Sequence, residues 1–133
     1  MKPFEGITVI EFSTMITASL AAMMLGEQGA RVIKVEPTET GDPLRYIGAE
    51  KGGISSIFAN CNRGKESIRL DLKSPDGQAI IREMATDCDV VIHNFRPGVM
   101  DKHGLGSERL RSINERLVYM AISGFGTKGP LSS

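Results

Sequence analysis

The chain has 133 residues, with 41% hydrophobic and 24% charged side chains, which is an ordinary composition for a soluble globular protein. Its sixteen basic and sixteen acidic residues cancel, which argues against a broad surface for nucleic acid or anionic lipid but allows a local pocket for one anionic ligand. No apolar run is long enough to span a membrane and the first residues lack the apolar core of a signal peptide, so we expect a cytoplasmic chain with no membrane partner.

Length and cysteine content set two further expectations. A chain of this length predicts one domain, residues 1–133, with a real core. Cys61 and Cys88 are not spaced as a CxxC or zinc pair, so they predict two reduced thiols and no bound metal. A disulfide, a zinc site or a thiol nucleophile is each a much weaker alternative.

The first third of the chain predicts a strand, a helix and a second strand. Residues 7–12 and 31–36 are rich in β-branched residues and predict the strands. Between them, residues 17–28 predict a helix with Thr17 as its N-cap and Gly29 just past its end. Such a unit crosses over right-handed and makes its two strands parallel. The turn between residues 13 and 17 contains no glycine, so classical dinucleotide binding is not expected.

The rest of the chain continues the alternation. Residues 37–56 form a long irregular loop, a type that is usually functional or mobile. Residues 67–72, 90–92 and 117–122 predict further strands, with residues 90–92 at the centre. Ser74 caps a helix that has Pro75 in its first turn, and Ser107 caps a shorter one. The helix after Ser74 is expected to bury one face, consisting of Ile80, Ile81, Met84 and Ala85. The pattern predicts an α/β fold: a Rossmann-like, doubly wound, mostly parallel sheet of about five strands.

Three polar segments could carry chemistry. The loop after residues 90–92, which contains Phe95 and Arg96, leaves the carboxyl end of a strand, where open α/β sheets bind ligands. Residues 62–65 place two cations and an amide around a glycine, which suits phosphate, although spacing alone modestly favours a solvated turn. Glu36 ends a strand and either meets a ribose hydroxyl or is a surface carboxylate paired with Lys34 or Arg45.

Two other features are ambiguous. His93 ends a buried strand, where a lone histidine is more often a hydrogen-bonded structural residue than a catalyst. The glycine-rich residues 124–130 could offer backbone N–H groups to an anion, or could be an unstructured exit from the fold.

Five separated motifs, in order and spacing, resemble the N-terminal part of the family III CoA-transferases of CaiB/BaiF type. This group includes formyl-CoA transferase, carnitine CoA-transferase and α-methylacyl-CoA racemase. The motifs are the opening strand after Gly6, LGEQGARVIKVE with the following GDP and Arg45, NCNRGKESIRLD, VVIHNFRPGVMDKHGLG, and LVYMAISGFGTKGP. The resemblance covers essentially the whole chain and implies a Rossmann-like domain that is truncated relative to the family.

The resemblance also implies a ligand and the residues around it. CoA or acyl-CoA would be the ligand, with the cations facing its phosphates and Phe95 shaping the pocket. The residues expected to border it are Met15, Ile16, Thr17, Glu36, Arg45, Asn62, Arg63, Lys65, Asn94, Phe95, Arg96 and, more weakly, Lys102 and the turn 124–126. The family's aspartate nucleophile belongs to sequence that follows the GFG…GP segment, so no catalytic residue is assigned here.

Three functions follow as hypotheses. The first choice is a truncated CoA-transferase domain that retains part of a CoA site and is not active alone. The second is a non-catalytic interaction module that forms a homo-oligomer or complements another chain. The third is a transferase or racemase subunit that is active only with a partner supplying the missing half.

Overall fold

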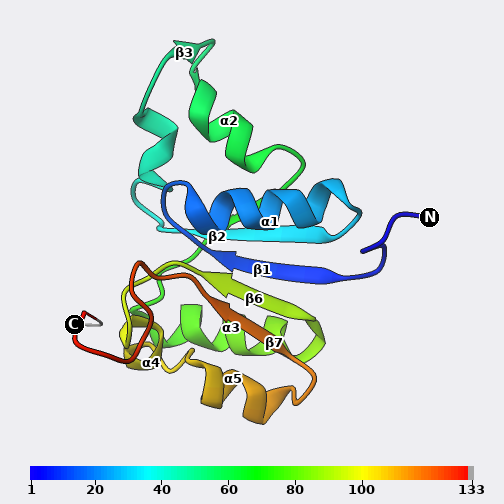
Figure 1. Ribbon diagram of the computed structural model, residues 1–133, viewed down its shortest axis with the longest axis vertical. Coiled ribbons are helices and arrows are strands. Elements are labelled where there is room, and N and C mark those ends of the chain that lie inside the picture. Colours follow the sequence, from blue (N-terminus) through cyan, green and yellow to red (C-terminus); the bar gives the residue numbers. More distant parts are fainter. Residues whose placement is uncertain (132–133) are drawn as a thin grey trace.

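The computed structural model describes residues 1–131. Its main sheet has five strands in the order β5–β2–β1–β6–β7 (Figure 1), and every neighbouring pair is parallel. The strands are β1 (Thr8–Phe12), β2 (Arg31–Glu36), β5 (Glu66–Arg69), β6 (Val90–His93) and β7 (Val118–Ala121). This arrangement confirms the predicted doubly wound α/β fold.

Helices connect the strands and cover both faces of the sheet. They are α1 (Thr17–Glu27), α2 (Ser56–Asn62), α3 (Pro75–Asp87), α4 (Val99–Lys102) and α5 (Ser107–Ile113). The segment between β2 and α2 holds the 3₁₀ helix η1 (Pro43–Tyr46) and a small antiparallel hairpin, β3 (Glu50–Lys51) with β4 (Ile54–Ser55). Figure 1 shows α2 and this hairpin projecting beyond α1, on the far side of it from the sheet.

Two apolar layers hold the sheet between its helices. Because successive side chains of a strand point to opposite faces, Ile10 and Phe12 lie on the face covered by α3 and α5. Val9 lies on the other face, where it packs with Ala18 and Ala22 of α1. Small residues let the α1 backbone approach the sheet closely, and all five of these side chains are fully buried.

The helix ends partly match the predicted caps. Ser74 does cap α3, since its Oγ accepts a hydrogen bond from the backbone N–H of Gly77 at 3.0 Å. Gly29 follows α1 with φ of +111°, a left-handed conformation that suits glycine. The prediction for Thr17 was wrong, because it is the first helical residue and Ile16 is the N-cap, without a side-chain cap. Ser107 was also wrong as a cap, because Gly106 occupies that position.

Three other predictions need correction. The central strand is β1, not residues 90–92, because β6 lies beside it on the side toward β7. Ile80 is 40% exposed, whereas Ile81 and Ala85 of the same helix are buried, so the buried face of α3 is narrower than predicted. Residues 37–56 are not wholly irregular, since they form η1 and the β3–β4 hairpin.

Candidate functional site

The carboxyl edge of the sheet contains a cavity of about 350 Å³. In the sheet, β1 lies between β2 and β6. The strands β2 and β5 extend the sheet on one side of β1 and the later strands β6 and β7 extend it on the other, so the strand order reverses at this edge beside β1. Segments that follow β1, β2, β5 and β6 all contribute to the walls. The lining residues are Ser13, Thr14, Val35, Glu36, Pro37, Thr38, Glu39, Thr40, Leu70, Asp71, Leu72, Lys73, Phe95, Val99 and His103.

The cavity is lined by six apolar residues and nine polar or charged ones, which include the carboxylates of Glu36, Glu39 and Asp71. Leu70, Leu72 and Phe95 are partly buried and pack against the core cluster between the sheet and α3. The exposed Lys73 adds a cation beside them. A cavity of a few hundred Å³ that combines apolar side chains with polar groups has the size of a small-molecule site.

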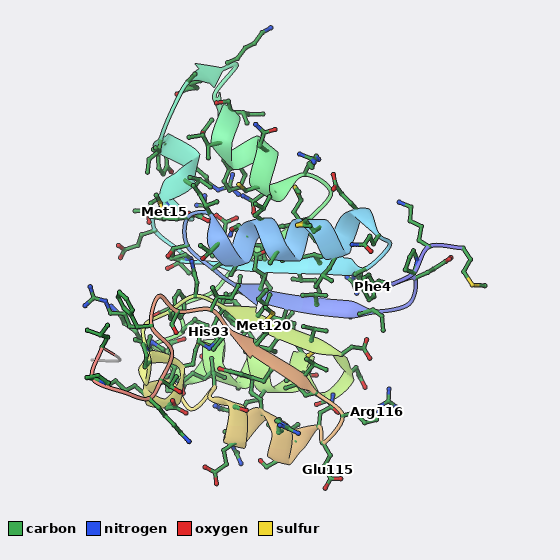
Figure 2. All side chains as sticks on the ribbon, in the orientation of Figure 1. Phe4, Met15, His93, Glu115, Arg116 and Met120 are labelled. Atoms are coloured by element: carbon green, nitrogen blue, oxygen red, sulfur yellow. The ribbon has the colours of Figure 1, made fainter. Side chains whose placement is uncertain are left out.

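The turn between β1 and α1 borders this cavity and is fixed by Asn94. The backbone N–H of Thr14 donates to Asn94 Oδ1 at 3.0 Å, and Asn94 Nδ2 donates back to the Thr14 carbonyl at 2.6 Å. The same Nδ2 also lies 3.1 Å from Thr17 Oγ1. Figure 2 shows Met15 on this turn, at the N-terminal end of α1. The loop after β6 therefore holds the loop after β1 in place.

A cluster of four charged side chains is buried between α1 and the sheet; we call it the ionic network. It consists of Glu11, Lys34, Asp42 and Lys65, each with a side chain that is 3% exposed or less. Lys34 Nζ lies 2.7 Å from Glu11 Oε1 and 2.9 Å from Asp42 Oδ2, and Lys65 Nζ lies 2.5 Å from Glu11 Oε2. Two cations and two anions balance, which is the condition under which charges can be buried.

Neutral groups complete the ionic network. Lys34 Nζ donates to Ser13 Oγ at 2.9 Å and to Ser19 Oγ at 3.0 Å. Lys65 Nζ donates to the Ser19 carbonyl and to Asn62 Oδ1, both at 2.8 Å. Burial lowers the pKa of Lys65, and Glu11 acts in the opposite direction. Glu11 Oε2 and Asp42 Oδ2 make no hydrogen bond within residues 1–131, but each faces a lysine in an ion pair.

Glu36 forms a second buried pair with Arg45. The guanidinium donates to Glu36 through Nε at 2.8 Å and Nη2 at 2.6 Å, and it also lies 4.0 Å above the centre of the Phe58 ring. Ser67 Oγ donates to Glu36 Oε1 at 2.6 Å, and the backbone N–H of Asp42 donates to Oε2 at 2.8 Å. Glu36 is therefore paired with Arg45, as one alternative expected, but it is buried and not a surface carboxylate.

These contacts predict an acid-sensitive contribution to stability. Burial raises the pKa of Glu36, but the hydrogen bonds from Arg45, Ser67 and Asp42 outweigh it and lower the pKa from 4.5 to about 2. The unfolded chain therefore binds this proton first, so the stabilisation is present above about pH 4.5 and is lost as pH falls toward 2. Glu36→Gln should lower the free energy of unfolding at pH 7. Between pH 4.5 and 2, the free energy of unfolding of this variant should fall less steeply than that of the native protein. Urea titrations at several pH values measure the free energy of unfolding of both proteins. An equal dependence of that free energy on pH in the two proteins would contradict the lowered pKa of Glu36.

His93 is buried and is held by contacts within the fold. It is 6% exposed, and its Nδ1 accepts a hydrogen bond from the backbone N–H of Phe95 at 3.2 Å. Its ring centre lies 5.4 Å from that of Tyr119 in an edge-to-face arrangement. Burial lowers the pKa of His93 although Asp101 acts in the opposite direction, so the ring is neutral near pH 7.

The structure places only some of the residues expected to border CoA at the cavity. Glu36 and Phe95 line the cavity, while Asn94 holds its wall. On the β1–α1 turn, Met15 and Ile16 are exposed and Thr17 contacts Asn94. Arg45, Asn62 and Lys65 are held in the internal contacts described above, so the expectation that the cations face phosphates does not fit Arg45 or Lys65 in this conformation.

The three remaining cations differ in position. Arg63 pairs with Glu27, the last residue of α1, whereas the cavity lies at the other end of that helix, roughly 16 Å away at 1.5 Å per residue. Arg96 and Lys102 are exposed, and neither makes an ion pair in the part of the chain that the structure describes. They follow β6, at the same edge of the sheet as the cavity.

Sequence reasoning missed most of the wall that comes from the loop after β5. Asp71 and Lys73 were not considered as site residues, although Leu70 and Leu72 beside them close the cavity. Ligands bind at the carboxyl ends of the strands in open α/β sheets, and this rule pointed to the loop after residues 90–92. The same rule would have pointed to Asp71 and Lys73, because residues 67–72 were also predicted as a strand of the same parallel sheet.

A doubly wound parallel sheet with a cavity at its carboxyl edge is the arrangement in which open α/β proteins commonly bind ligands. The family model described as CoA-transferase family III matches residues 4–133, and the chain belongs to this family. The acetyl-CoA:oxalate CoA-transferase of Acetobacter aceti is 45% identical over 130 residues, which are 98% of this chain and 33% of that protein. The human succinyl-CoA:glutarate CoA-transferase is 38% identical over 133 residues, covering 99% of this chain and 30% of the relative.

Solved structures agree with the sequence matches. A CaiB/BaiF family protein from Brucella suis superposes with a TM-score of 0.92 at 38% identity, over 98% of this chain and 36% of that one. Rv3272 from Mycobacterium tuberculosis gives a TM-score of 0.92 at 37% identity, over 99% and 37%. The chain therefore spans about a third of the length of these relatives. Among the described residues, no helix is long and apolar enough to cross a membrane, and no group of three or more potential ligands could hold a metal ion.

Proposed function

We propose that this chain supplies part of the CoA or acyl-CoA site of a family III CoA-transferase. The observation that carries the proposal is the cavity of about 350 Å³ at the carboxyl edge, whose lining includes the apolar Leu70, Leu72 and Phe95 and one lysine, Lys73. Family membership supports this choice of ligand, because the curated relatives named above act on CoA esters. We expect residues 1–133 to act as one domain of such a protein, in the cytoplasm.

The cavity chemistry suggests how CoA would lie. The flat, weakly polar adenine suits the walls formed by Leu70, Leu72 and Phe95. Its phosphates would then meet cations that are not already paired, namely Arg96 and Lys102, with Lys73 beside the cavity. Arginine provides a fork of donors that fits phosphate oxygens, while lysine acts as a point charge.

We propose that the transfer chemistry needs sequence beyond these 133 residues, in the same polypeptide or in a second one. The family resemblance implies an aspartate nucleophile that carries the acyl group and that belongs to sequence after the GFG…GP segment. A bound thioester without a nucleophile has no covalent route to transfer. The carboxylates of Glu11, Glu36 and Asp42 do not substitute, because lysine or arginine neutralises each of them in a buried pair.

A specific observation favours the second candidate, an interaction module. On the edge strand β7, Val118 is 60% exposed and Met120 is 46% exposed, and both lie on the same face of the sheet. Apolar side chains on an open edge are a common contact surface. Light scattering over a wide concentration range separates the two candidates, since a monomer throughout would argue against self-association.

Arg96 gives a direct test of phosphate recognition. If Arg96 contacts the 3′-phosphate, Arg96→Ala should weaken CoA roughly fivefold, or about 1 kcal/mol, and weaken dephospho-CoA less. Calorimetric titration of both ligands measures the difference. Arg116→Ala is the matched control. Arg116 is exposed and precedes β7, so it lies at the amino ends of the strands, away from the cavity at their carboxyl ends (Figure 2). Equal losses for the two ligands in Arg96→Ala would remove this role.

A further inference from the structure

The β1–α1 turn has an unfavourable backbone conformation at Met15. Its φ is +65°, and it is the one non-glycine residue in the described chain with positive φ. A side chain that is neither glycine nor asparagine prefers to avoid this region, at a cost of about 1 kcal/mol or more. Some other contact must therefore hold Met15 in place.

Asp42 supplies that contact. Its Oδ1 accepts hydrogen bonds from the backbone N–H of Met15 at 3.2 Å and of Leu44 at 2.9 Å. Its other oxygen, Oδ2, lies 2.9 Å from Lys34 Nζ, and its own backbone N–H donates to Glu36. Asp42 is fully buried, so one carboxylate connects the β1–α1 turn with the loop after β2 and with the ionic network.

The ionic network therefore has a role that stability does not explain. Burying charge is expensive, and well-packed apolar side chains are often at least as stabilising as a buried ion pair. What the charges provide here is a fixed orientation: Lys34 is anchored by Glu11, Ser13 and Ser19 at once. The anchored Lys34 holds Asp42 Oδ2 in an ion pair, while Oδ1 of the same carboxylate faces the turn.

We propose that Asp42 is a positioning residue, through which the ionic network holds Met15 in its left-handed conformation and so shapes the β1–α1 wall of the ligand site. The effect of this turn on CoA binding rests on the proposed function, in which the wall of the CoA site includes Ser13 and Thr14. The effect on the turn itself can be measured without any ligand.

The first test uses the native chain and amide hydrogen exchange followed by NMR. Although Met15 is 39% exposed, its N–H should exchange at least tenfold more slowly than the amides of Gly52 and Gly53, which lie in an exposed turn. In Asp42→Ala this protection should fall at least tenfold, while the amides at the centre of α3 keep theirs. Exchange of the native Met15 amide at the rate of Gly52 would overturn the proposal, whether or not the variant folds.

The second test separates positioning from general loss of structure. In the Asp42→Ala background, Met15→Gly relieves the left-handed conformation, whereas Met15→Ala removes the side chain but keeps the unfavourable φ. Asp42→Ala should weaken CoA at least fivefold, and Met15→Gly should recover more of that loss than Met15→Ala. Equal behaviour of the two double variants would overturn the proposal. If native protein binds no CoA, the proposed function fails, and hydrogen exchange alone decides the role of Asp42.

Discussion

Lys34→Met is expected to lower the free energy of unfolding by about 3 to 5 kcal/mol at pH 7. Methionine fills much of the same volume, but it leaves Asp42 without its cation and Glu11 with Lys65 alone. Both carboxylates are fully buried, so water cannot replace the lost ammonium without opening the structure. A loss of this size is a large fraction of the 5–15 kcal/mol that is typical of whole domains.

Arg31→Met is the matched control for Lys34→Met. Arg31 lies in the same strand, β2, and pairs with Glu66 through hydrogen bonds of 2.7 and 2.8 Å, but both side chains are more than half exposed. Exposed pairs contribute about 0 to 1 kcal/mol, so this variant should remain close to the native protein in urea unfolding. Similar small losses for the two variants would show that water reaches the ionic network.

Gly77→Ala should lower the free energy of unfolding by about 3 kcal/mol, the upper end of the usual range for overpacking. A Cβ at this position would lie 2.1 Å from the Asp71 carbonyl oxygen, which is backbone and cannot rotate away. Alanine gains up to about 1 kcal/mol over glycine in a helix, which is too little to offset that clash. Since Asp71 lines the cavity, the shift should also weaken the binding of CoA.

Gly124→Ala makes the same chemical change where, apart from the two neighbouring residues, no atom of residues 1–131 lies within 4 Å of the added Cβ. It should leave unfolding within about 0.5 kcal/mol of the native protein. A comparison of urea midpoints for the two variants measures the difference. A Gly77→Ala protein as stable as Gly124→Ala would mean that the β5–α3 connection yields easily and does not fix the cavity wall.

The sequence predicted the fold well because the main signals are local. Short β-branched runs alternate with helical segments, and parallel strands in one sheet require the helices to cross over between them. The order of the strands was harder, since nothing in residues 90–92 shows that β6 lies beside β1 and not at the centre. The helix N-caps were also predicted wrongly. Thr17 and Ser107 are of residue types that favour the N-cap position, but each is the first residue inside its helix.

The candidate site was predicted less well, because pairing between distant charges leaves no local pattern. Lys65 reads as a free cation beside Arg63, yet it is buried against Glu11, 54 positions earlier in the chain. Arg45 is likewise held by Glu36. What could be predicted was the loop after β6, where the carboxyl-edge rule applies directly, and there Asn94 and Phe95 do reach the turn and the cavity.

Calorimetric titration of the purified chain with CoA tests the central proposal most directly, with ATP and NAD as comparators. The account predicts saturable binding that is selective for CoA and that is weakened in Arg96→Ala but not in Arg116→Ala. Absence of heat at millimolar CoA, with the chain shown to be folded, would contradict a retained CoA site and would favour the interaction module.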